Sequence, residues 1–151
     1  MYSPINLDID RLHHCVEAIN NRKFLGRGEG RTTAILHLLV GELELCDPYL
    51  TYIVVVPTSA MVPYMLNILV PMLEDVGLEM TLCSRERIIV NDVQVRFMSA
   101  YTFYQTHATR GLRIAKVFWD AEHAALDQID FEFIEYTHNY FKCLGVPFVG
   151  C

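Results

Sequence analysis

The stretch LGRGEGRTT (residues 25–33) places three glycines directly before the apolar run TTAILHLLVGELEL (residues 32–45). Glycine adopts backbone conformations and permits close approaches that other residues do not. Backbone N–H groups that converge at the start of a helix, with the positive end of the helix dipole, form a natural site for a phosphate group. The stretch therefore predicts a phosphate-binding loop followed by a buried helix. A tight glycine-rich turn without a ligand is the alternative.

The loop matches part of the phosphate-loop pattern G-x-x-x-x-G-K-[ST]. Gly30 and Thr32 occupy the positions of the last glycine and the hydroxyl, whereas Leu25 stands where the first glycine belongs. Arg31 replaces the lysine, and its planar guanidinium still offers a fixed positive charge to phosphate oxygens. We expect Thr32, with Thr33 as a neighbouring candidate, to offer a hydroxyl to Mg²⁺. The dinucleotide pattern G-x-G-x-x-G fails, because Arg31 stands at its third glycine.

Downstream of the loop, strand-like and helix-like segments alternate. TYIVVVP (residues 51–57) and IAKVFWD (residues 114–120) have the continuous apolar character of strands buried on both faces. RIIVNDVQVRF (residues 87–97) alternates about Asn91-Asp92, which is typical of a hairpin. The other expected elements are a helix over 59–77, strands over 80–84 and 145–149, a short helix after 99, and a long helix or helix pair over 121–143. The pattern predicts an α/β three-layer sandwich with a mainly parallel sheet and an added β-hairpin.

A second chemical feature lies in KVFWDAEHA (residues 116–124), where Asp120 stands at the exit of an apolar strand. A carboxylate in that position beside a phosphate loop holds the Mg²⁺ shell. Glu122 is a candidate general base, although it is separated from Asp120 by Ala121. Two structural roles are the alternatives. Asp120 can cap a helix, and Glu122 can be a favourable charge in that helix's first turn.

Composition and charge narrow the class of protein. The 151 residues are 52% hydrophobic, which fits one folded domain over 1–151. No apolar run is long enough to span a bilayer. The five cysteines show no C-x-x-C spacing and are expected to be reduced thiols in the cytoplasm. A net charge of −6 argues against tight independent binding of nucleic acid.

The basic residues and a set of aromatic residues each allow more than one interpretation. The basic residues either form a local basic face or are simply solvated; they are Arg22, Lys23, Arg27 and Arg31 around the loop and Arg85, Arg87, Arg96, Arg110, Arg113 and Lys116 later. An aromatic set near the C-terminus can stack on bases, but a core or a protein interface is the preferred interpretation; it comprises Phe131, Phe133, Tyr136, Tyr140 and Phe141. Exposure of this set would mark a partner surface.

Taken in order, these motifs resemble the ATPase half of viral large terminases and the related first domain of superfamily-two helicases. In that family a loop of the form G-R-G-x-G-K-T precedes a helix. A buried strand ending in Pro-Thr, an Arg-Gly step and an apolar strand ending in Asp-Glu-Ala then follow. The matching positions here run from Arg27 to Thr32, at Pro57-Thr58 and Arg110-Gly111, and from Val117 to His123. The match covers about 30 to 125.

The resemblance implies ATP and Mg²⁺ as ligands and double-stranded DNA or a viral packaging complex as partner. It assigns phosphate binding to the glycine loop, namely Gly26, Arg27, Gly28, Glu29, Gly30, Arg31, Thr32 and Thr33. Thr32 and Asp120 take the metal role. Glu122 and Arg31 take the catalytic roles.

Three departures qualify this assignment: Arg31 replaces the lysine, Ala121 splits the Asp-Glu pair, and no room is left for a nuclease domain before Cys151. We therefore expect a viral, terminase-like nucleotide-binding protein of the host cytoplasm with weak or absent hydrolysis, acting in DNA packaging or another DNA-handling complex, with an oligomer as an option and no membrane association. The alternative is a non-catalytic interaction module that keeps the fold and has lost the nucleotide chemistry.

Overall fold

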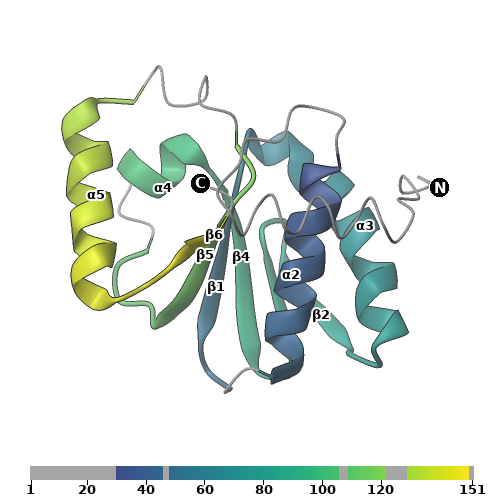
Figure 1. Ribbon diagram of the computed structural model, residues 1–151. Helices are drawn as coiled ribbons and strands as arrows, with labels where there is room; N and C mark the ends of the chain where they lie inside the picture. The colour runs from purple at the N-terminus through teal and green to yellow at the C-terminus, as the bar shows by residue number, and fades with distance from the viewer. Residues whose placement is uncertain (1–29, 46–47, 106–108, 122–128, 150–151) are drawn as a thin grey trace.

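The structure is a computed structural model that describes residues 30–45, 48–105, 109–121 and 129–149 (Figure 1). Its centre is a six-stranded sheet of order β2-β3-β4-β1-β5-β6. Strands β1 (Thr51–Val56), β4 (Val93–Ser99), β5 (Ile114–Trp119) and β6 (Phe148–Val149) run parallel to one another. All six residues of β1 are buried, as expected for a central strand covered on both faces. The predicted mainly parallel α/β sheet is confirmed.

The added hairpin is also present. Strands β3 (Arg87–Val90) and β4 are antiparallel, and Asn91 and Asp92 both adopt positive φ, at 49° and 63°. Two consecutive residues with positive φ define a type I′ turn, whose twist matches that of the flanking strands. Strand β2 (Met80–Ser84) pairs antiparallel with β3 and forms the edge of the described sheet.

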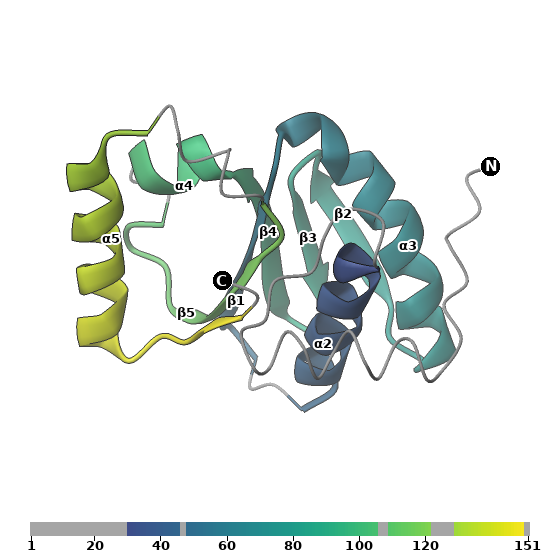
Figure 2. The same ribbon diagram turned by 45° about the horizontal axis from the view of Figure 1, so that its top comes forward.

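Helices cover the sheet on both faces and complete the three layers (Figure 1, Figure 2). On one face lie α2 (Arg31–Leu45) and α3 (Val62–Asp75). A short 3₁₀ turn (Ser59–Met61) directly precedes α3. Their buried side chains pack on Tyr52, Val54 and Val56 of β1. On the other face α4 (Ala100–Gln105) and α5 (Phe131–Leu144) pack around Ile53 and Val55. The alternation along β1 thus divides the core into two clusters, one on each face.

The helix boundaries follow local sequence signals. Helix α5 begins after Asp130, whose side chain accepts a hydrogen bond from the Glu132 backbone N–H at 3.3 Å, and it ends at Gly145 with φ 70°. Of the helical pattern predicted over 121–143, the described part is helical from Phe131, and residues 122–128 lie outside the described residues. The helical spacing of the apolar residues Ile9, Leu12, Val16 and Ile19 also predicts a helix over 9–19, which lies outside them as well. Helix α3 contains Pro71 and leads to Gly77, which has φ 76°. Within the described ranges, every helix is too short or too polar to cross a membrane.

Candidate functional site

Two segments far apart in the sequence meet at the carboxyl ends of the parallel strands. Asp120 directly follows β5, and α2 begins at Arg31. The Arg31 Nε donates to Asp120 Oδ1 at 3.0 Å, and the Thr32 hydroxyl donates to Asp120 Oδ2 at 2.7 Å. These pairs join residues 89 and 88 positions apart. The carboxyl edge of a parallel sheet is where α/β proteins bind ligands, so this contact marks the first candidate site.

Local geometry explains how α2 is aimed at Asp120. Gly30 has φ 90°, a conformation that favours glycine, and its carbonyl accepts the first helical bond from Ala34 N–H at 3.0 Å. At the other end of α2, Glu42 accepts hydrogen bonds from Lys116 of β5 and from the Tyr52 hydroxyl of β1. The helix is therefore fixed over these two strands. Its amino end, with free N–H groups and positive dipole, lies beside Asp120.

Asp120 is a buried carboxyl, with 3% of its surface exposed. Burial disfavours the ionised form and raises the pKa of Asp120 above its usual value, although the hydrogen bond from Thr32 and the charge of Arg31 both oppose this rise. The raised pKa means that these two donors do not fully replace the stabilisation that water would give to the ionised carboxylate. A further positive charge beside the carboxylate, such as a metal ion, would stabilise its ionised form.

The donor set fits Mg²⁺. Mg²⁺ prefers oxygen ligands, and in nucleotide sites it uses one or two protein oxygens together with phosphates and water. The Thr32 hydroxyl and the Asp120 carboxylate supply two such oxygens within hydrogen-bond distance of each other. No cluster of three or more His, Cys, Asp or Glu side chains is present in the described ranges, so an all-protein metal cage is not indicated there.

Arg31 behaves differently from a phosphate-loop lysine that reaches for the ligand. Its guanidinium forms an ion pair with Asp120, and only 16% of its side chain is exposed. The positive charge beside the Asp120 carboxylate is therefore the guanidinium of Arg31. A phosphate group at this helix end would therefore compete with Asp120 for the guanidinium.

The position after Asp120 is closed to a catalytic carboxylate. Ala121 is 4% exposed and packs in the core cluster beneath α4 and α5, on the face of the sheet opposite to α2. Its carbonyl accepts a hydrogen bond from the Trp119 indole N–H at 2.8 Å, which fixes the backbone there. The expected base, Glu122, lies outside the described residues.

The structure thus brings together three of the predicted residues, Arg31, Thr32 and Asp120. Gly30 is placed at the start of α2, and Thr33 follows in its first turn, partly buried. Gly26, Arg27, Gly28 and Glu29 lie outside the described residues. The helix-cap alternative for Asp120 is weakened, because its carboxylate oxygens bind side chains of α2.

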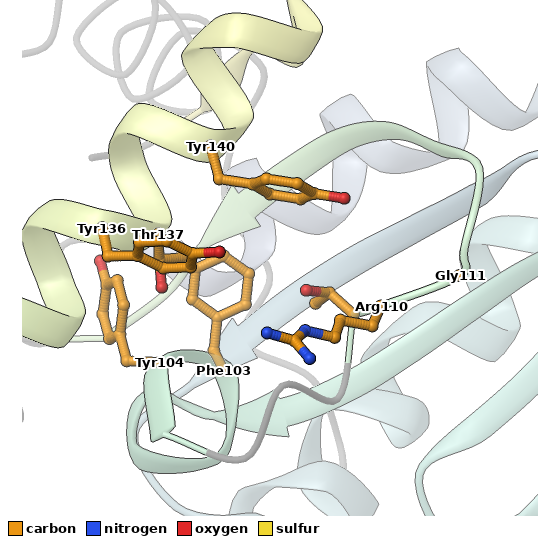
Figure 3. A pocket seen from close by; sticks show the side chains of 8 residues that line it. Phe103, Tyr104, Arg110, Gly111, Tyr136, Thr137 and Tyr140 are labelled. Carbon is orange, nitrogen blue, oxygen red and sulfur yellow. The ribbon is translucent and has the colours of Figure 1, made fainter.

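A second hollow, of about 350 Å³, lies between α4, α5 and the segment before β5 (Figure 3). Its walls include Phe103, Tyr136 and Tyr140, and Arg110 reaches toward these rings. Phe141 of the predicted aromatic set is buried and stacks on Phe103 with centroids 5.5 Å apart. The other four members are exposed, namely Phe131, Phe133, Tyr136 and Tyr140. The aromatic set is therefore divided between core and surface, and no single sequence signal separates the two groups.

Comparisons with known proteins agree with this architecture. No family model and no curated protein matches the sequence significantly. The fold resembles the large terminase ATPase domain of Thermus phage P74-26, with a TM-score of 0.63 and 21% identity over 97% of this chain. It also resembles the large terminase of a second, thermophilic bacteriophage, with a TM-score of 0.59 and 12% identity over 91% of this chain. The chain spans 64% and 37% of those two chains. It therefore has the fold of a terminase ATPase domain.

Proposed function

We propose that the chain binds a nucleoside triphosphate, with ATP as the expected ligand and Mg²⁺ as its counter-ion, at the junction of α2 and β5. One observation carries this proposal: Arg31 and Thr32, at the amino end of α2, both contact the buried carboxylate of Asp120. An anion-binding helix end and a metal-binding carboxylate at one edge of a parallel sheet suit a metal-bound polyphosphate. The fold shared with terminase ATPase domains supports the same ligand.

Each residue has a distinct role in this proposal. The amide groups at Gly30 and the start of α2 bind phosphate oxygens, with the helix dipole adding to the attraction. Thr32 and Asp120 hold Mg²⁺, which neutralises charge on the phosphates when it is bound. A metal at this position would supply the positive charge that the carboxylate requires, and the Arg31 guanidinium would then be free to contact the phosphates.

The same contacts support weak or absent hydrolysis. The Arg31–Asp120 ion pair must break before Asp120 accepts the metal. The buried Ala121 offers no carboxylate to orient an attacking water. Glu122 and Arg31 are the remaining candidates for catalysis. We therefore expect nucleotide binding with slow turnover at most.

The proposal also includes the biological role of the chain. The two similar structures are phage large terminases, so we infer a viral protein that acts in DNA packaging or another DNA-handling complex in the host cytoplasm. Double-stranded DNA or a packaging protein is the expected partner, and self-association is an option. The chain's acidic balance, with a net charge of −6, favours a partner protein that contributes to the DNA contact.

Isothermal titration calorimetry with ATP tests the ligand, with Mg²⁺ in one series and a chelator in the other. We expect saturable binding that is weaker without Mg²⁺ and lost in Thr32→Val. Asp120→Asn should remove the effect of Mg²⁺ on binding. Its matched control is Asp75→Asn, which changes an exposed acid at the end of α3 and should bind as the wild type does. The absence of binding at millimolar ATP·Mg would exclude a working nucleotide site.

A second candidate function is a non-catalytic interaction module. The observation that favours it is the exposed aromatic surface of α5, where Phe131 is 71% and Tyr136 56% exposed. Exposed aromatic rings are typical of protein interfaces. Under this alternative ATP·Mg has no effect on stability, whereas Tyr136→Ala and Tyr140→Ala weaken a complex with a packaging protein. An unchanged complex in both variants would count against it.

A further inference from the structure

Two arginines face each other across the β3–β4 hairpin, away from the proposed nucleotide site. Arg87 of β3 is directly opposite Arg96 of β4. The Phe97 N–H donates to the Glu86 carbonyl at 2.8 Å, so the neighbouring Arg87–Arg96 pair is of the non-hydrogen-bonded kind. Side chains are closest in such pairs, with Cβ atoms about 4.5–5.5 Å apart. The hairpin therefore holds two positive charges side by side.

Both arginines are partly buried, and each has one nitrogen without a partner. The Nε of Arg87 and the Nε of Arg96 are shielded from solvent and have no hydrogen-bond partner among the described residues. Like charges directly opposite each other destabilise a sheet, and a buried donor without an acceptor adds to that penalty. Neither the opposed charges nor the unpartnered donors stabilise the fold by themselves. An anion beside the two guanidinium groups would offset their repulsion, and it would offer an acceptor to each side chain that turns toward it.

A hollow of about 250 Å³ is present at these arginines. It is lined by Ser84 at the end of β2, Glu86 of the β2–β3 turn, Arg87, Arg96, Phe97, Met98 and Thr102. Arg96 is in register with Ile53 of β1, so the arginines lie on the α4–α5 face of the sheet, opposite to α2. Among the described residues of the lining, Glu86 is the one acidic group, and it offsets one of the two positive charges. The lining keeps a positive surplus.

We propose that the Arg87–Arg96 hollow is an anion site that takes a phosphate group. Two guanidinium groups can present parallel N–H donors to the oxygens of a tetrahedral phosphate, and arginine is favoured for such planar recognition. The Ser84 hydroxyl provides a further polar group at the rim. This proposal is independent of nucleotide binding at Asp120, because strand β1 separates β4 from β5 and the arginines project to the other face. A phosphate group can come from a free phosphate compound or from a nucleic-acid backbone.

Thermal unfolding in low-millimolar inorganic phosphate, with sodium chloride at matched ionic strength as reference, tests the site. The wild type should show a saturable rise in melting temperature, and Arg87→Gln or Arg96→Gln should abolish it. Arg85→Gln removes the same charge from an exposed position outside the lining and should keep the rise. Arg96→Lys should reduce it, because lysine keeps the charge and loses the fork.

Two further results separate this site from others. Asp120→Asn should keep the phosphate effect, and its loss there would place the phosphate at α2 and overturn the proposal. Without phosphate, each glutamine variant should melt at or above the wild-type temperature, since it removes the repulsion. A glutamine variant that melts lower, or fails to fold, contradicts the argument.

Fluorescence anisotropy with a short DNA duplex identifies the source of the phosphate. A backbone phosphate predicts that either glutamine variant lowers the slope of log affinity against log salt by about one, with Arg85→Gln as comparison. A phosphate effect on melting with unchanged duplex binding supports a free phosphate compound. If Arg87→Gln and Arg96→Gln change neither the phosphate effect on the melting temperature nor the binding of the duplex, the proposal is wrong.

Discussion

Replacing Asp120 by asparagine should stabilise the fold while it removes the response to Mg²⁺. Asp120 is almost completely buried, and its pKa is raised because burial outweighs the hydrogen bond from Thr32 and the charge of Arg31. Ionisation of this carboxyl therefore weakens the folded state relative to the unfolded chain. Asparagine keeps the shape and an acceptor for one of the two donors, and it carries no charge. Arg31, which is 16% exposed, can turn toward water in the variant.

The expected magnitude is modest. Single stabilising substitutions commonly raise the free energy of unfolding by about 0.5–2 kcal/mol. For a chain of this size each kcal/mol corresponds to about 2–4 °C in the melting temperature. Urea unfolding at neutral pH and calorimetry therefore resolve the effect. Asp75→Asn again provides the control, because that side chain is exposed.

The pH dependence offers a second measurement of the same effect. Because the folded-state pKa of Asp120 is raised, the folded state keeps its proton at pH values where the unfolded chain has lost it. The contribution of Asp120 to stability is therefore greatest in acid, and it falls as the pH rises from about 3.9, the usual aspartate value, through the raised pKa. The advantage of Asp120→Asn over the wild type should be small in acid and grow across that window.

A variant that is less stable than the wild type at neutral pH would refute this reasoning. That result would mean that the ionised carboxylate, with Arg31 and Thr32, stabilises the fold by more than its burial opposes. Asp120 would then be a structural ion-pair residue. The inference that it awaits a metal ion would lose its energetic support.

The other predictions concern packing and the turn. Phe141→Ala should lower the free energy of unfolding by about 3–5 kcal/mol in urea titrations, because the ring is fully buried against Phe103. Ala121→Glu should lower it by about 3–5 kcal/mol through an uncompensated buried charge, so restoring an adjacent Asp-Glu pair should fail to produce an ATPase. Asp92→Val should cost about 1–2 kcal/mol, since Asp92 has φ 63°, whereas Asp92→Gly should unfold at or above the wild-type midpoint. Equal midpoints for the valine and glycine variants would contradict the type I′ turn.

The elements that the sequence predicts well are those with one strong local signal. The β-branched run of β1 has no polar interruption, so only a doubly covered strand accommodates it. The Asn91-Asp92 pair tolerates positive φ, and the alternating residues on both sides of it specify the hairpin. The end of α5 coincides with Gly145, which takes the left-handed conformation. Each of these features depends on a few neighbouring residues.

The features that the sequence did not reveal depend on contacts between distant segments. The order of motifs predicted that Gly30 and Asp120 share one edge of the sheet, but the Arg31–Asp120 ion pair depends on how α2 sits over β5. Alternation along β5 explains why Asp120 faces α2 while Ala121 faces the opposite core, which the single letters D-A-E do not show. The Arg87–Arg96 pair is the exception, because the turn at Asn91 and Asp92 sets the hairpin register and the sequence therefore contains the information for this pair.

A structure determined with a non-hydrolysable ATP analogue and Mg²⁺ tests the central claim most directly. We predict that the phosphates lie at the Gly30 turn and the amino end of α2, that the metal contacts Thr32 and Asp120, and that Arg31 has left the carboxylate. An analogue bound elsewhere, for example in the hollow at Arg110, or an intact Arg31–Asp120 pair beside a bound nucleotide, would contradict it.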